Sequence, residues 1–200
     1  MRKGFTLIEL LIVIAIIAIL ALIAIPNFLE AQVRAKISRV KSDMRSTATA
    51  IEAYLVDWNL IMGAWDWADA TGATQEQGRL IAYSRLTTPI AYMTSFPKDP
   101  FQVGTQTQGR AEEEFQFQTS NTFSKHNWWR ARQRGYTWGL NSMGPALNRI
   151  SSITFIDVLR GLTAQQERTF VYDPTNGTVS QGFIIRTNKG EYKVDISPSV

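Results

Sequence analysis

The amino-terminal 25 residues constrain the fold more than any other stretch, because a short basic leader is followed by a long apolar run. Every residue from Leu10 to Ile25 is Leu, Ile, Val or Ala. Counting back to Phe5 adds only two polar residues, Thr6 and Glu9. An α-helix rises about 1.5 Å per residue, so this run is about 31 Å long, close to the thickness of the hydrocarbon core of a bilayer. The sequence therefore predicts a membrane-spanning helix.

Two simpler interpretations of the run explain less of it. A secretory signal peptide has a shorter apolar region, about 7 to 15 residues, and a small-residue cleavage site, but the residues after Ile25 form no such site. A plain membrane anchor accounts for the apolar run and for Arg2 and Lys3, but it gives no reason for Glu9. A carboxylate inside a membrane is costly, and such a residue is by default a functional candidate. Glu9 is therefore expected to have a cationic partner.

The segment Gly4-Phe5-Thr6-Leu7-Ile8-Glu9-Leu10-Leu11, with Pro26 closing the apolar run, resembles the prepilin signature of type IV pilins and type II secretion pseudopilins. The resemblance implies that a membrane peptidase cleaves between Gly4 and Phe5 and methylates the new amino terminus on Phe5. It also implies that Glu9 neutralises the charged terminus of a neighbouring subunit during filament assembly. This fits the physics, because two charges that are each costly in lipid become tolerable as a pair.

Composition bounds the rest of the chain. The 200 residues leave room for one modest domain beyond the membrane segment. There is no cysteine, so neither a disulfide nor a thiolate metal site is possible. Arg2 and Lys3 favour a cytoplasmic amino terminus in the inner membrane and a periplasmic body. Their removal on processing would reduce the 21 basic side chains to 19, against 17 acidic ones, and so small an excess does not indicate a nucleic-acid partner.

The apolar run is predicted to continue as an amphipathic helix from Pro26 to about Leu60. Pro26 should kink this helix, because proline removes a backbone donor and clashes with the preceding turn. Apolar residues recur at an average spacing of about 3.6, which is the period of one helical face. These residues are Leu29, Val33, Ile37, Val40, Met44, Ala48, Ile51, Leu55 and Trp58. The basic residues between Arg34 and Arg45 are then a solvated face, or they contact lipid headgroups or acids of adjacent subunits.

The remaining signals predict short elements. Residues 86–93 read as a second helix, capped by Thr87 or Thr88 and with Pro89 in its first turn. A short hairpin is expected in FQFQT, residues 115–119, and a strand at 135–140 followed by a turn at 141–145. Residues 153–162 read as a short helix. Residues 169–172 and 182–186 read as two strands joined by a turn that contains Asn-Gly. The predicted fold class is α+β, with one long helix packed on a small antiparallel sheet.

Two segments outside the membrane helix, LTTPIAYMTSFPKDPF (86–101) and YDPTNGTVSQG (172–182), resemble the major pseudopilins of type II secretion, especially a divergent environmental branch. Many members of that family bind calcium through acids in the carboxy-terminal region. Here Ala146 and Phe183 stand where acids are expected. Asp157 and Asp173 are the remaining candidate ligands, but nothing in their spacing provides the six to eight oxygens that calcium prefers. We therefore expect no cofactor and no bound metal.

The sequence divides into a leader at 1–4, a transmembrane and filament-core helix at 5–26, its amphipathic continuation at 27–62 and a periplasmic α+β domain at 63–200. The expected function is that of a pseudopilus subunit. The resemblance implies the following partners: copies of the same chain in a helical filament, the prepilin peptidase, minor pseudopilins and the inner-membrane assembly platform. A type IV pilin of a surface fibre is the alternative. A third class, a membrane-anchored enzyme or binding domain that uses the six tryptophans, is disfavoured because the only histidine, His126, belongs to no recognisable catalytic triad.

Overall fold

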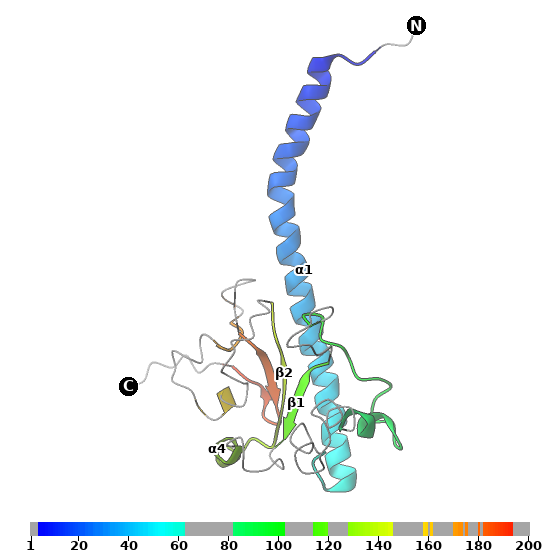
Figure 1. The fold of residues 1–200 in the computed structure, drawn as a ribbon, viewed down its shortest axis with the longest axis vertical. Helices are drawn as coiled ribbons and strands as arrows, with labels where there is room; N and C mark the ends of the chain where they lie inside the picture. Colours follow the sequence, from blue (N-terminus) through cyan, green and yellow to red (C-terminus); the bar gives the residue numbers. More distant parts are fainter. Residues whose placement is uncertain are drawn as a thin grey trace, which may run out of the picture.

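The computed structural model describes residues 4–62, 82–102, 114–119, 128–145, 158–159, 161, 170–173, 175, 180 and 182–193, with the side chains of 128–130 left aside. Helix α1 (Leu7–Trp58) is followed by β1 (Gln116–Thr119), α4 (Trp128–Gln133), β2 (Trp138–Ser142), β3 (Ile184–Thr187) and β4 (Gly190–Glu191). Figure 1 shows a long helix whose far half lies against a small sheet. The predicted α+β, pilin-like fold is confirmed.

Helix α1 has two halves with different surroundings. Its large apolar side chains from Leu7 to Leu29 are all exposed, from 46% at Val13 to 84% at Leu7. Packing against the rest of the described chain starts at Val33 and continues through Ile37, Val40, Met44, Ala48 and Ile51. These six residues belong to the predicted apolar stripe, so the helical period placed the buried face correctly. The predicted helix and the observed one end within two residues of each other.

The helix continues through Pro26. Figure 1 shows a gentle curve along the whole of α1 and no sharp bend anywhere in the helix, so the predicted kink is not observed. Proline removes one backbone donor and crowds the preceding turn, and a long helix can absorb this change by bending slightly over several turns.

The four strands form one antiparallel sheet in the order β1-β2-β3-β4. Successive residues of a strand point to opposite faces. On β3, Ile184 accordingly packs into the cluster on the α1 side, whereas Ile185 joins a second cluster that includes Ala131 of α4 and Phe183. Helix α1 lies against β3. The sheet is thus covered by apolar side chains on both faces.

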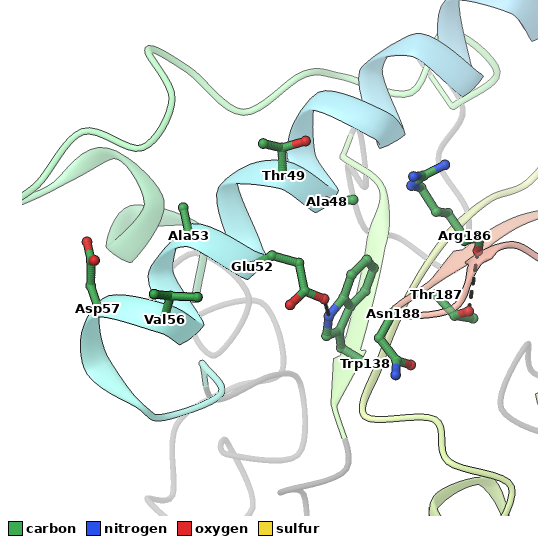
Figure 2. A pocket seen from close by; sticks show the side chains of 11 residues that line it. Ala48, Thr49, Glu52, Ala53, Val56, Asp57, Trp138, Arg186, Thr187 and Asn188 are labelled. Atoms are coloured by element: carbon green, nitrogen blue, oxygen red, sulfur yellow. Dashed lines mark hydrogen bonds between the residues drawn. The ribbon is translucent and has the colours of Figure 1, made fainter.

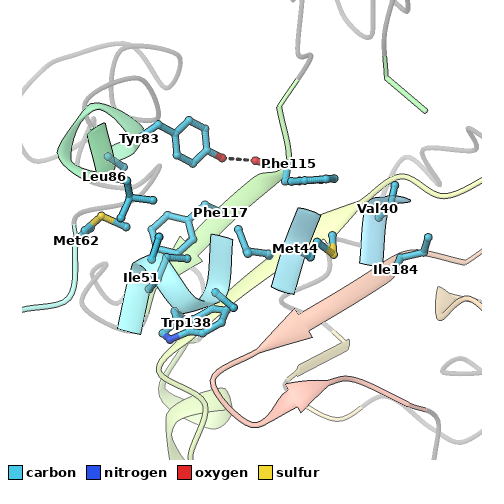
Figure 3. Close-up of a cluster of buried hydrophobic side chains, with 14 of the residues drawn as sticks. Val40, Met44, Ile51, Met62, Tyr83, Leu86, Phe115, Phe117, Trp138 and Ile184 are labelled. Atoms are coloured by element: carbon cyan, nitrogen blue, oxygen red, sulfur yellow. Dashed lines mark hydrogen bonds between the residues drawn. The ribbon is translucent and has the colours of Figure 1, made fainter. Parts of the chain in front are cut away.

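The main core lies between α1 and the sheet (Figure 3). Phe117 of β1 and Trp138 of β2 are each 1% exposed. Trp138 donates a hydrogen bond from Nε1 to Glu52 Oε1 on α1, 2.7 Å away, and the Tyr83 hydroxyl donates to the carbonyl of Phe115. Burying aromatic side chains of this size supplies much of the stability of a small domain. The indole nitrogen of Trp138 and the hydroxyl of Tyr83 therefore both have hydrogen-bond acceptors.

The helix predicted at 86–93 is wrong in position. The chain is helical at 82–87 and leaves the helix before the Thr88–Pro89 bond, which is cis. The residue before a proline disfavours the α conformation, so the helix ends where it was expected to begin. The Thr87 and Thr88 hydroxyls both donate to the carbonyl of Ser84 and so act at the carboxyl end of this helix.

Three predicted strand regions are also corrected. Residues 116–119 form a strand, but it pairs with β2 and not within a local hairpin. Strand β2 runs through Asn141 and Ser142, where the sequence predicts a turn. Residues 171 and 183 form an isolated parallel bridge, so the two segments do not make the predicted antiparallel hairpin, and 184–187 pairs instead with β2 and β4. Within the predicted helix at 153–162, the described residues 158, 159 and 161 are helical.

Candidate functional site

The predicted cleavage point precedes helix α1. The first helical residue is Leu7, and Thr6 has extended backbone angles of φ −80° and ψ 151°. Phe5 is 83% exposed, and a side-chain carbon placed on Gly4 would have no neighbour within 4 Å. The Gly4–Phe5 peptide bond therefore lies in an exposed, non-helical segment. A protease could approach this bond without unwinding α1.

Glu9 folds back on the start of its own helix. Its Oε2 accepts hydrogen bonds from the Thr6 backbone nitrogen at 2.9 Å and from the Thr6 hydroxyl at 2.8 Å. The Thr6 hydroxyl in turn accepts from the Glu9 backbone nitrogen at 3.3 Å. This reciprocal arrangement is a capping box, which satisfies backbone donors that a helix start leaves unpaired. This capping role was not predicted, although the Thr-x-x-Glu spacing signals it.

Helix α1 is long and apolar enough to cross a membrane, and its most apolar segment is not buried against the rest of the described chain. The segment from Leu7 to Ile25 precedes Val33, the first residue packed on the domain core. A polypeptide in water does not leave so many large apolar side chains uncovered without another partner. The exposed apolar surface of this half of the helix is therefore suited to a lipid or protein surrounding.

A groove of about 530 Å³ lies between the far half of α1 and the turn after β3 (Figure 2). Glu52 and Arg186 line it, and so do small α1 residues such as Ala48 and Ala53. Glu52 is already the acceptor for Trp138, and Arg186 Nε is buried without a hydrogen-bond partner. Among the described residues, no three His, Cys, Asp or Glu side chains gather to hold a metal ion.

Asp99 is a buried carboxylate that sequence reasoning did not single out. It is fully buried, and its oxygens accept from Phe101 N at 3.0 Å, Gln102 Nε2 at 3.2 Å and Met143 N at 3.2 Å. Burial raises the pKa of Asp99 above its ordinary value, although the hydrogen bonds act in the opposite direction. These bonds tie the 97–102 loop to the end of β2. The location of Asp99 indicates a structural role.

The two calcium candidates have separate outcomes. Asp157 and Ala146 lie outside the described residues. Asp173 is described, and its Oδ1 accepts from the backbone nitrogen of Thr175 at 2.8 Å and from the Thr175 hydroxyl at 2.7 Å. These contacts form a local turn in which the side chain bonds to the backbone two residues on. The expectation that no calcium is bound stays a prediction.

Comparison with known proteins bears directly on the amino-terminal segment. The family model described as "Prokaryotic N-terminal methylation motif" matches residues 1–25, which contain Gly4, Phe5 and Glu9. Its amino-terminal segment is similar to that of type IV pilin-like proteins. Similar proteins include the type IV major pilin protein PilA of Myxococcus xanthus, which is 42% identical over 81 residues, or 40% of this chain and 36% of that protein.

Two further relatives support the same family. The type IV major fimbrial protein FimA of Dichelobacter nodosus is 54% identical over 57 residues, 28% of this chain and 36% of its own length. The fimbrial protein EcpB of Eikenella corrodens is 56% identical over 54 residues, 27% of this chain and 34% of its own length. The chain thus spans about a third of the length of these relatives. No solved structure matches this chain.

Proposed function

We propose that this pilin-like chain is the structural subunit of a helical filament, and that its first half-helix moves from the bilayer into the filament core on assembly. The observation that carries the proposal is the exposure of every large apolar side chain from Leu7 to Leu29, next to a well-packed domain. Lipid covers this surface in the membrane-bound subunit, and neighbouring helices cover it in the filament. The match of the methylation motif to residues 1–25 supports processing by a prepilin peptidase.

Glu9 is the proposed docking residue. After cleavage, the new ammonium group would stand on Phe5, and a methyl group would leave its positive charge in place. A carboxylate offers about four acceptor positions on two oxygens. Glu9 can therefore cap its own helix through Thr6 and also accept a hydrogen bond from the terminus of a neighbouring subunit. Pairing removes the cost of leaving either charge alone in an apolar surrounding.

The structure allows the two roles of Glu9 to be tested separately in the native host. Glu9→Gln keeps a side chain that a capping box accepts but removes the charge, whereas Glu9→Ala removes both. We expect both variants to insert and to be cleaved, and both to yield no filaments. Glu30→Gln is the matched control, because among the described residues Glu30 forms an ion pair with Arg34, four residues further along the same helix. Normal filaments from Glu9→Gln would show that capping, and not charge pairing, is what assembly needs.

Two kinds of filament remain to be separated. The relatives named above are pilins and fimbrial proteins, which favours a type IV pilus on the cell surface. The resemblance of residues 86–101 to major pseudopilins favours a type II secretion pseudopilus, with minor pseudopilins and an inner-membrane platform as partners. We retain the pseudopilus as the finer proposal, with the amino terminus cytoplasmic and the domain periplasmic. Deletion should then abolish secretion of folded exoproteins without removing surface fibres, whereas loss of fibres with normal secretion would assign the chain to a pilus.

We also propose that the chain is not an enzyme. The carboxylates that line the described grooves already serve other groups: Glu52 accepts from Trp138, Asp57 accepts from the Tyr92 hydroxyl, and Glu191 pairs with Lys41. Of the six tryptophans, Trp65 and Trp67 lie outside the described residues, and so does His126. Variants that fail to assemble should leave every hydrolytic activity of the membrane fraction unchanged.

A further inference from the structure

A second groove, of about 390 Å³, lies where the loop after α4 meets the β3–β4 hairpin. Three of its lining side chains are cations, Arg134, Lys189 and Lys193, and two are aromatic, Tyr136 and Tyr192. Glu191 is the one acid among the groove's described residues, and it is paired with Lys41 at 2.6 Å, outside the lining. Within the described part of the chain, no carboxylate forms an ion pair with any of the three cations. The groove therefore carries positive charge.

The cations of this groove are held in place by the fold. Lys189 Nζ donates to the carbonyl of Arg134, and Arg134 Nη1 donates to the carbonyl of Leu159 at 3.0 Å. Both charges also lie over the ring of Tyr136, with Lys189 Nζ 5.0 Å and Arg134 Cζ 5.9 Å from its centroid. Contacts of this length are attractive because the face of an aromatic ring is electronegative. Because these two side chains are already ordered, a ligand that binds them would lose little free energy to ordering them.

The two loops that carry the cations are joined by further bonds. Asn188 accepts from Thr137 N at 3.0 Å through its Oδ1 and donates to the Gly135 carbonyl at 3.1 Å through its Nδ2. Gly135 has a φ of +78°, and a side-chain carbon there would come within 3.1 Å of Lys189 Nζ. A glycine at this position therefore suits both the backbone and the lysine. The groove is preorganised before any ligand arrives.

We propose that this groove binds the carboxylate groups of an acidic polysaccharide. Carboxylates are the complement of fixed guanidinium and ammonium groups, and the two tyrosines supply hydroxyl groups and apolar edges suited to sugar rings. Nucleic acid fits less well. Its binding needs a long basic stripe and open aromatic faces for bases, whereas here the charge is local and Tyr136 already serves two cations. The proposal concerns the domain surface alone and does not depend on filament assembly.

Fluorescence anisotropy of a labelled oligogalacturonate, titrated with the full chain in a non-ionic detergent at low salt, tests the site. Lys193→Gln is the cleanest variant because no described contact depends on it, and Lys189→Gln in the same chain removes a second charge. We expect the single variant to weaken binding about fivefold and the double variant about twenty-five-fold, as for exposed charge pairs lost one at a time. Lys36→Gln on α1 is the matched control for net charge and should leave the affinity unchanged.

Several results would overturn the proposal. It fails if the oligogalacturonate does not bind, or if Lys36→Gln weakens binding as much as Lys193→Gln does, since either result would deny a local site. Tighter binding of a DNA duplex of equal charge, lost in the same double variant, would replace the polysaccharide with nucleic acid. Circular dichroism shows whether the double variant is still folded. If Lys189→Gln alters the loop, the Lys193→Gln variant alone tests the proposal.

Discussion

Removing the carboxylate of Asp99 should destabilise the domain strongly although the residue is far from the proposed assembly site. In Asp99→Ala, the backbone nitrogens of Phe101 and Met143 lose their acceptor inside the protein. Each buried donor left unpaired costs about 1–3 kcal/mol, and relief from burying a carboxylate offsets part of the total. We expect a net loss of about 2–4 kcal/mol in the free energy of unfolding.

The measurement is urea unfolding of the full chain in non-ionic detergent, followed by tryptophan fluorescence. With an m-value of about 2 kcal/mol/M, the loss corresponds to a midpoint lower by about 1–2 M urea. Asp43→Ala is the control, because Asp43 is also an aspartate on this domain but pairs with Arg39 at the surface, 3.5 Å away. Exposed pairs contribute about 0–1 kcal/mol. Equal shifts for the two variants would refute the reasoning from buried donors.

The same residue gives a pH dependence of known sign. Burial raises the pKa of Asp99 in the folded state above the unfolded value of 3.8. Between these two pKa values the folded chain binds more protons than the unfolded chain, so stability falls as pH rises through that window and then levels off. The Asp99→Asn variant, which does not titrate, should lose this part of the decline. A decline of the same size in Asp99→Asn would assign it to other groups.

Three further predictions concern single positions. Gly182→Ala should cost more than about 3 kcal/mol or prevent folding, because its side-chain carbon would lie 2.1 Å from the backbone carbon of Val171; expression and thermal melting check this. Phe117→Ala should cost about 3–5 kcal/mol in urea unfolding, as expected for a fully buried aromatic residue. Gly4→Val should block cleavage and leave an unassembled precursor, seen as a larger species on immunoblots, and normal processing would contradict the assigned cleavage point.

Local signals in the sequence predicted some parts of the fold well. The position of the buried stripe on α1 follows from a 3.6-residue period that extends over many turns, and such a signal averages out single exceptions. The exposed apolar half and the place of Glu9 within it are also local features. The capping box at Thr6 and Glu9 is also a local feature, because the Thr-x-x-Glu spacing signals it, even though the carboxylate stands out first as a charge that needs a partner.

The rest depends on contacts between segments far apart in the chain. The partner of β1 lies beyond α4, and β3 returns to β2 from more than forty residues away, so no turn motif specifies either pairing. Asp99 gives no sequence signal of burial, since its donors come from its own loop and from Met143. The cationic groove likewise exists only because residues 134–136 meet residues 189–193. Short strands with weak alternation do not determine such pairings.

The central claim, that this chain is a processed filament subunit, is tested most directly by the intact mass and amino-terminal sequence of the protein recovered from membranes of its own host. We expect a chain that lacks Met1 to Gly4 and carries one added methyl group on Phe5. A chain that still begins at Met1, without a methyl group, in cells with an active prepilin peptidase would contradict it and would return the protein to the class of simple membrane-anchored domains.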